Sequence, residues 1–275
     1  NLHAGRNLTA NIRGNVYNQK AMNAGGTLSL TADGSLTQTT AGVLSAEHLH
    51  VNAADVENHG LIQAKEETIL HTAHLKNDAT GGIYSRRINV QAKNGTEEDI
   101  SAAALYNSGK IISETDATIH AASVANTGTL AAAIAPSGKA NDAGTLTIAA
   151  KELSNNNAKI LSGKDIVVSA ENIHTKSGQI AGNGDVSLTV KNALDIQNAA
   201  LQSGRDLAIE ADAMPLTGNL SSNRDMRLTF HGSGLSNEAA AENFGNLHAG
   251  RNLMANLQGN IRNQRKLEAG GALSL

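Results

Sequence analysis

Short stretches along the chain alternate apolar and polar residues with a period of two. Examples are Leu28/Leu30, Ile88/Val90 and Leu146/Ile148, in which one polar residue separates each apolar pair. This alternation is typical of β-strands, because successive side chains of a strand point to opposite faces. No stretch keeps the i, i+3, i+4, i+7 spacing of an amphipathic helix for long, so the pattern predicts an all-β chain.

These strands recur at a nearly constant distance. We take the first apolar residue of each as an anchor, and successive anchors are 20, 21, 19, 20, 29, 29, 20, 20, 21, 19, 27 and 20 residues apart. A period near 20 residues indicates a repeat architecture in which each unit packs on its neighbours. The anchors are Leu8, Leu28, Leu49, Thr68, Ile88, Ala117, Leu146, Ile166, Val186, Leu207, Met226, Leu253 and Leu273.

Each unit carries two further short strands. About eight residues after the anchor comes an apolar residue, then one residue, then in most units an Asn, and a third short strand follows. Three short strands in so few residues must pair with their equivalents in the next unit, which gives parallel sheets wound into a coil. We therefore predict a right-handed parallel β-helix of about thirteen coils and about 60 Å in length. The recurrent residues are Asn18, Asn58, Asn77, Asn107, Asn126, Asn155, Asn198, Asn237 and Asn263.

The recurrent Asn has two possible structural uses. Amides in register on successive coils can hydrogen-bond along a column. Asn also tolerates the left-handed backbone that a sharp corner requires.

Three units are longer than the rest, with extra residues near Lys93–Ala102, Ala131–Ala143 and Glu238–Phe244. They interrupt different parts of the coil, so we expect separate surface loops that build no cleft, above a thin aliphatic interior without a pocket. Residues 1–30 and 246–275 are identical at 20 of 30 positions. We therefore expect residues 1–275 to be a single β-helix repeat segment, a fragment of a longer array.

Composition narrows the possible functions. Aromatic residues make up 2% of the chain, so the interior must be filled mainly by Ala, Leu, Ile and Val. With a formal net charge of −3 and no basic run, the chain has no electrostatic footprint for nucleic acid. The absence of Cys excludes disulfides and Cys-based zinc sites. No apolar run is long enough to span a membrane, and the first residues do not form a signal peptide.

The Gly-Arg-Asn/Asp-Leu phrase, the apolar-x-Asn-x-Gly link and the 20-residue period resemble the haemagglutinin repeats of filamentous haemagglutinin-type exoproteins. The stretches LQSGRDLAIEA (201–211) and LHAGRNLMANLQGNIRN (247–263) carry the resemblance best. The resemblance implies a right-handed β-helix, secreted by a two-partner system and displayed as a filament on the surface of a Gram-negative cell. Its partners would be the outer-membrane transporter during export and a receptor on host or bacterial cells.

Members of that family use the filament for adhesion, or as a passive stalk that projects a C-terminal toxin in contact-dependent growth inhibition. Either use is compatible with this sequence. The repeats of the family have no catalytic residues, so the resemblance implies that the chain is not an enzyme. We expect no catalytic, cofactor-binding or metal-binding residues, no cofactor and no small-molecule substrate.

Three patterns were weighed as possible chemistry. The ten His residues scatter over many columns of the repeat and build no three-ligand metal site. Gly182-Asn183-Gly184-Asp185 resembles a calcium-binding solenoid turn but occurs once, and such turns work in tandem. A glycan-cleaving β-helix would need converging carboxylates. The candidates recur in four successive coils, where we expect turn residues that bond their own backbone: Asp165, Asp185, Asp206 and Asp225.

Overall fold

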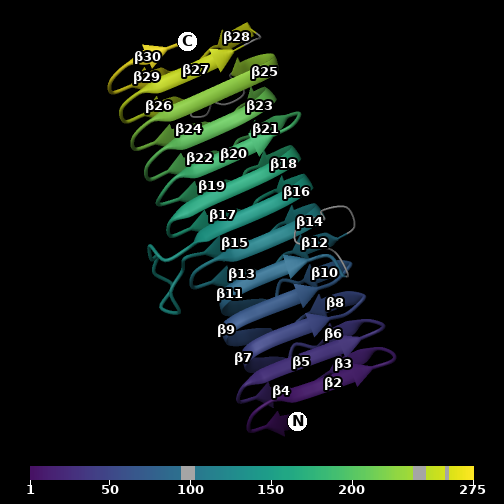
Figure 1. The fold of residues 1–275 in the computed structure, drawn as a ribbon. Helices are drawn as coiled ribbons and strands as arrows, with labels where there is room; N and C mark the ends of the chain where they lie inside the picture. The colour runs from purple at the N-terminus through teal and green to yellow at the C-terminus, as the bar shows by residue number, and fades with distance from the viewer. Residues whose placement is uncertain (94–102, 238–245, 258–259) are drawn as a thin grey trace.

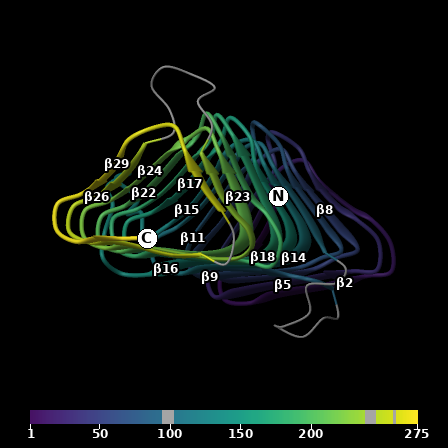
Figure 2. The same cartoon turned by 90° about the horizontal axis from the view of Figure 1, so that it is seen from above.

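The computed structural model describes residues 1–93, 103–237, 246–257 and 260–275. These residues form thirty parallel strands and no helix, wound into a rod with the two termini at opposite ends (Figure 1). Successive coils rise to the right on the near side of the rod, which is a right-handed winding (Figure 1). Seen along the axis, the coils superimpose as a flattened triangle (Figure 2). The predicted all-β parallel β-helix is confirmed.

The part of the chain that the structure describes holds no helix long and apolar enough to cross a membrane.

The triangle has three faces, which we number in chain order from the anchor. The first face holds the anchor strands, the second the strands with the recurrent Asn, and the third the strands that follow. Strands on the first face alone are β2 (Leu8–Ile12), β5 (Thr27–Ala32), β20 (Val186–Val190), β27 (Leu253–Leu257) and β30 (Leu273–Ser274). Strands on the second face alone are β3 (Val16–Asn18), β6 (Leu36–Gln38), β8 (Asp55–Asn58), β10 (His74–Asn77), β12 (Ala104–Asn107), β21 (Leu194–Gln197) and β28 (Asn260–Asn263).

The third face and the corners complete the coil. Strands on the third face alone are β1 (Leu2–Ala4), β4 (Ala21–Ala24), β13 (Lys110–Ser113), β15 (Thr129–Ala132), β17 (Lys159–Ser162), β19 (Gln179–Gly182), β22 (Ala200–Ser203), β24 (Asn219–Ser222), β26 (Leu247–Ala249) and β29 (Leu267–Ala269). Longer strands that bend around the corner between the third and first faces are β7 (Val43–Asn52), β9 (Leu61–His71) and β11 (Gly82–Gln91). Those that bend between the first and second faces are β14 (Ala117–Asn126), β16 (Thr145–Asn155), β18 (Asp165–Lys176), β23 (Leu207–Leu216) and β25 (Met226–Asn237).

The anchor residues lie in one continuous column. Leu8 pairs with Leu28, Leu28 with Leu49, and the register continues without interruption to Leu273. The two anchor spacings of 29 residues do not disturb it, because Ile88 pairs directly with Ala117 and Ala117 with Leu146. The extra residues of those units therefore leave the coil at a corner.

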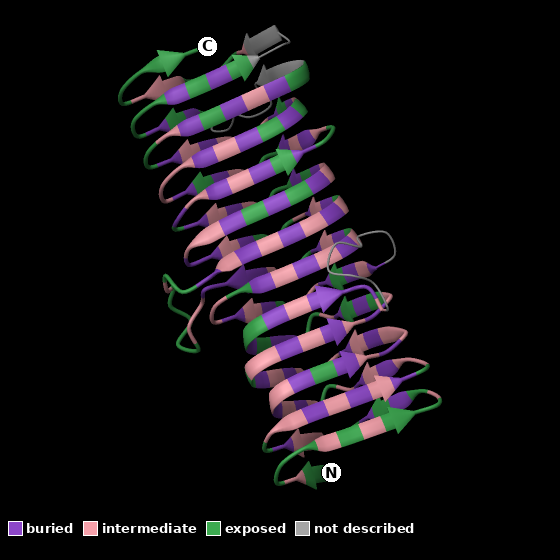
Figure 3. Ribbon diagram, in the orientation of Figure 1, coloured by how far each residue is buried: buried purple, intermediate pink, exposed green. Residues whose placement is uncertain are grey.

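The core is a thin aliphatic column along the axis. Burial alternates along each strand, so that buried and exposed residues form stripes across the rod (Figure 3). Leu28 and Leu30 are each 1% exposed, and Phe230 is the bulkiest of the fully buried side chains. Thr68, the one polar anchor, is also fully buried. Alternating strand side chains of this kind need only enough width for one layer of branched aliphatic groups from each face.

The recurrent Asn residues of the second face form a hydrogen-bonded ladder, as predicted. Asn58 Nδ2 donates to Asn77 Oδ1 over 2.7 Å, and three further amide-to-amide bonds of 2.8 Å continue from Asn77 through Asn107 and Asn126 to Asn155. Each of these amides also donates to a backbone carbonyl of the following coil, such as that of Thr129 at 3.1 Å from Asn107. The ladder thereby satisfies buried amides that an aliphatic core could not.

The ladder prediction was wrong at one position. Thr175, Ile196 and Leu216 continue the column beyond Asn155, so Ile196 occupies the place that we expected for Asn198. Asn198 lies two residues further on, at a corner with a left-handed φ of 48°. It serves the second of the two predicted uses of Asn, because its side chain tolerates that conformation better than most.

The second insertion follows β15 and forms a tight hairpin, residues 133–143. Ala135 N–H donates to Lys139 O over 2.8 Å, and Ile134 forms an antiparallel bridge with Ala140. Gly138 takes the left-handed φ of 79° that the turn requires. The other two predicted insertions, apart from Lys93, lie outside the described residues.

Candidate functional site

The column of Asp residues was the strongest candidate for catalysis in the sequence. The structure does stack these residues at the corner between the third and first faces. Each accepts a hydrogen bond from the backbone N–H of the equivalent residue one coil further on, at 2.8, 3.1, 3.0 and 3.2 Å in chain order. The expectation that each would bond its own backbone was wrong. Asn7 makes the same bond to Thr27 N–H at 2.9 Å, so the role needs an oxygen acceptor and not a charge.

Arginines bind the remaining carboxylate oxygens of the Asp column. Arg205 Nη2 lies 2.9 Å from Asp165 and 3.1 Å from Asp185, and Arg251 Nη2 lies 2.5 Å from Asp225. The hydrogen bonds from Arg251 hold the pKa of Asp225 below its ordinary value. A general acid needs a raised pKa and a free proton. The column is thus built as a corner ladder neutralised by arginine.

The His residues lie apart from one another on the outside of the coil. Leu49 is buried and His48 and His50 flank it on the outer surface, as predicted. Several His residues pair with a carboxylate of a neighbouring coil, for example His74 Nδ1 with Asp55 at 2.7 Å. Partial burial, together with nearby His50, lowers the pKa of His71. Within the described ranges no three His, Asp or Glu side chains come together as metal ligands.

The Gly182-Asn183-Gly184-Asp185 turn is a corner stacked on the previous coil. Gly184 N–H donates to Lys164 O over 2.6 Å, and Asp185 N–H donates to Asp165 Oδ1 over 2.8 Å. These bonds occupy the groups that a calcium loop would turn toward its ion.

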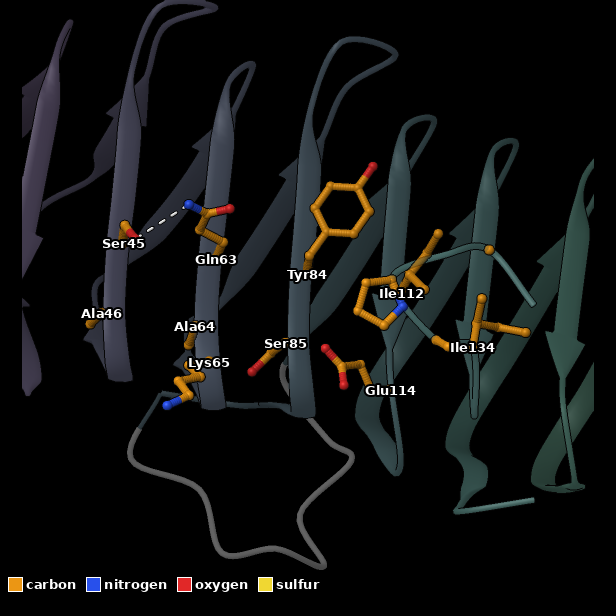
Figure 4. A pocket seen from close by; sticks show the side chains of 13 residues that line it. Ser45, Ala46, Gln63, Ala64, Lys65, Tyr84, Ser85, Ile112, Glu114 and Ile134 are labelled. Carbon is orange, nitrogen blue, oxygen red and sulfur yellow. Dashed lines mark hydrogen bonds between the residues drawn. The ribbon is translucent and has the colours of Figure 1, made fainter. Parts of the chain in front are cut away.

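A pocket of about 460 Å³ lies beneath the hairpin 133–143, at the end of the third face (Figure 4). The prediction that the insertions would build no cleft was therefore wrong for this loop. The hairpin reaches back over three earlier coils, so residues from β7, β9, β11 and β13 form the floor. The pocket is lined by Ser45, Ala46, Gln63, Ala64, Lys65, Tyr84, Ser85, Ile112, Glu114, Ile134, Ala135, Pro136 and Gly138.

Two features of the sequence mark this pocket in retrospect. Tyr84 is one of three Tyr in the chain, and Pro136 is one of two Pro. Neither residue has a place in the repeat. The floor residues come from three units and the cover from a fourth, so no local motif contains them.

The fold defines a parallel β-solenoid repeat protein without an evident catalytic centre in the described residues. The model of the haemagglutinin repeat family matches residues 1–87, 87–135, 143–198 and 177–264. The chain belongs to this family of filamentous haemagglutinin-type exoproteins, and it is a segment of such a filament.

One curated relative is Toxin CdiA of Escherichia coli, 28% identical over 206 residues. The similarity covers 70% of this chain and 6% of the length of that protein. No solved structure matches the chain significantly.

Proposed function

We propose that this segment is a rigid filament section of a secreted surface exoprotein and that it serves adhesion to host or bacterial cells. The observation that carries the proposal is the unbroken anchor column from Leu8 to Leu273. A rod with one continuous register converts chain length into reach, at about 4.8 Å per coil. Its function then resides in length, stiffness and surface.

Export would follow the family's two-partner route. An outer-membrane transporter is the partner during secretion, and a receptor on a target cell is the partner afterwards. Coil-by-coil folding suits this route, because each unit contacts only its neighbours and folding can propagate along the chain as it emerges. The proposed location is the surface of a Gram-negative cell.

A second function is favoured by the similarity to Toxin CdiA. In that case the segment is a passive stalk that holds a toxin away from the producing cell. The stalk needs only the length of the rod, whereas adhesion needs its particular surface.

One exchange experiment separates these two functions. In the full-length exoprotein, residues 1–275 are replaced by the same number of coils from another part of its repeat array. For adhesion we expect cell binding to fall while the filament length in electron micrographs stays constant. Unchanged binding together with unchanged contact-dependent killing would contradict adhesion by this segment and favour the stalk.

The rod itself is tested by deletion in register. Removal of residues 146–206 joins the coil before Leu146 to the anchor Leu207 and takes out three coils. The isolated segment should shorten by about 14 Å in solution scattering and keep its β-sheet circular dichroism. Removal of residues 146–155 alone breaks the register and is the matched control, which we expect not to fold.

A further inference from the structure

The pocket beneath the hairpin is held open by fixed contacts. Asn141 Nδ2 donates to Glu114 O over 2.9 Å, and Asn141 N–H donates to Ala133 O over 2.8 Å. These bonds tie the base of the hairpin to the coil below it. A preformed pocket of this volume suits a small ligand, because no loop needs to be ordered on binding.

Ser85 supplies an unused hydrogen-bonding group at the floor of the pocket. Ser85 is 4% exposed, and its hydroxyl has no hydrogen-bond partner among the residues that the structure describes. The equivalent Ser113, one coil on, donates to Thr115 O over 3.0 Å. Ser85 lacks such an acceptor because the next carbonyl, that of Arg86, already accepts from Thr115 N–H and Oγ1. A buried hydroxyl without a partner is unfavourable, so a ligand that bonds it gains affinity.

The charges of the pocket cancel. Lys65 and Glu114 lie at the same end of the pocket as Ser85, and Gln63 and Tyr84 lie toward the other end (Figure 4). One cation and one anion give no net attraction for a charged ligand. Together with the hydroxyl and the amide, they offer both donors and acceptors to an uncharged polar molecule.

Tyr84 gives the site a flat apolar surface. A Cβ at position 82 would lie 2.5 Å from Tyr84 Cε2, so only Gly82 allows the ring to lie along the strand. Tyr84 also borders a second hollow of about 330 Å³, which is lined by Gly60, Gly81 and Lys110 among others. The ring therefore stands between two hollows, with polar groups beyond it on either side. This arrangement matches a ring-shaped ligand that has an apolar face and a polar edge.

We propose that this pocket binds a neutral pyranose ring of a glycan. The C–H face of the sugar packs on Tyr84, and its hydroxyls bond Ser85, Gln63 and Glu114. The second hollow receives the neighbouring sugar of the chain. This inference rests on the proposed adhesive function and assigns it a ligand class.

The test is ligand-observed NMR on the purified segment. The probes are the methyl pyranosides of glucose, galactose and mannose, N-acetylglucosamine, and the pair lactose and 3′-sialyllactose. We expect saturation transfer to at least one neutral sugar, and no gain in affinity for sialyllactose over lactose. Absence of transfer to every neutral probe overturns the inference, and so does tighter binding of the acidic member of the pair.

Variants locate the site. Tyr84→Ala should weaken binding about tenfold, while Tyr84→Phe should stay within about twofold because the ring is kept. Ser85→Ala should also weaken binding, with a denaturation midpoint no lower than that of the parent, because it removes an unsatisfied hydroxyl. Tyr106→Ala, which removes an exposed ring of the second face, is the control and should bind normally. Equal losses in the Tyr84 and Tyr106 variants would place the sugar elsewhere and overturn the inference.

Two cell-binding arms distinguish the source of the glycan. Binding to deglycosylated host cells tests a host glycan, and binding to bacteria without outer-membrane polysaccharide tests a bacterial one. If the segment binds cells but no sugar, adhesion stands and the glycan inference is overturned. If it binds sugar through Tyr84 but no cell, the glycan inference stands and the adhesive function is overturned.

Discussion

The Asn ladder predicts that the effect of a substitution depends on its place in the column. Asn107 lies in the middle of the ladder, where it accepts from Asn77 and donates to Asn126, both over 2.8 Å. Asn155 lies at the end, where it accepts from Asn126 but has no amide beyond it. Leu is accepted at this column elsewhere, since Leu216 is buried there. Asn107→Leu and Asn155→Leu therefore differ mainly in the number of amide bonds that each breaks.

The magnitudes follow from that number. A lost buried hydrogen bond destabilises by about 1 kcal/mol, and a buried amide group left without a partner adds about 1–3 kcal/mol. Asn107→Leu breaks two ladder bonds and removes the bond to Thr129 O at 3.1 Å, so we expect a loss of about 3–5 kcal/mol. Asn155→Leu breaks one ladder bond and should destabilise by about half as much.

The assay is guanidinium unfolding of the purified segment, followed by far-ultraviolet circular dichroism. Asn192→Ala, at an exposed corner, is the control and should change the free energy of unfolding by less than about 0.5 kcal/mol. Equal losses for Asn107→Leu and Asn155→Leu would refute the ladder as a chain of coupled bonds. A parent-like midpoint for Asn107→Leu would refute any net stabilisation by it.

Three further predictions concern single groups. Thr68→Val should raise the free energy of unfolding by about 1–2 kcal/mol, because the buried Thr68 hydroxyl has no partner among the described residues; Thr72→Val should lower it, since Thr72 Oγ1 donates to Ala54 O and His74 O. Ala133→Gly should raise the melting temperature by relieving a left-handed φ of 56°, whereas Ala132→Gly in β15 should lower it. The pKa of Asp225 is lowered in the fold by hydrogen bonds from Arg251, so its stabilisation is complete above the ordinary value of 3.8 and is lost as the pH falls through the lowered folded value. Thermal melts from pH 5 to pH 2 should therefore fall more steeply for the parent than for Asp225→Asn, and parallel curves would contradict this.

The repeat could be predicted from the sequence because it is set by local chemistry. Every anchor, from Leu8 to Leu273, pairs with the next one in the predicted register. Strand alternation and a fixed period are both readable in one dimension. The Asn column could be predicted for the same reason, except at Asn198. There, an apolar residue followed two positions later by Asn fits the ladder pattern and the corner pattern equally well.

The pocket could not be predicted, because it depends on where a loop lies after it leaves the coil. Pro136 and Gly138 identify a turn, but nothing in the sequence directs that turn back over Tyr84 and Ser85. The bonding of the Asp column failed for a related reason. A side chain at a corner can bond its own turn or the next coil, and the distance between coils decides which.

The uninterrupted register across the long units has an evolutionary consequence. Ile88 pairs with Ala117 as closely as Leu8 pairs with Leu28, although the loops between them differ greatly in size. A corner can therefore gain, lose or exchange a loop while the neighbouring strands keep their partners. Such a rod acts as a mounting rail, on which new recognition elements can be fitted one corner at a time without redesign of the support.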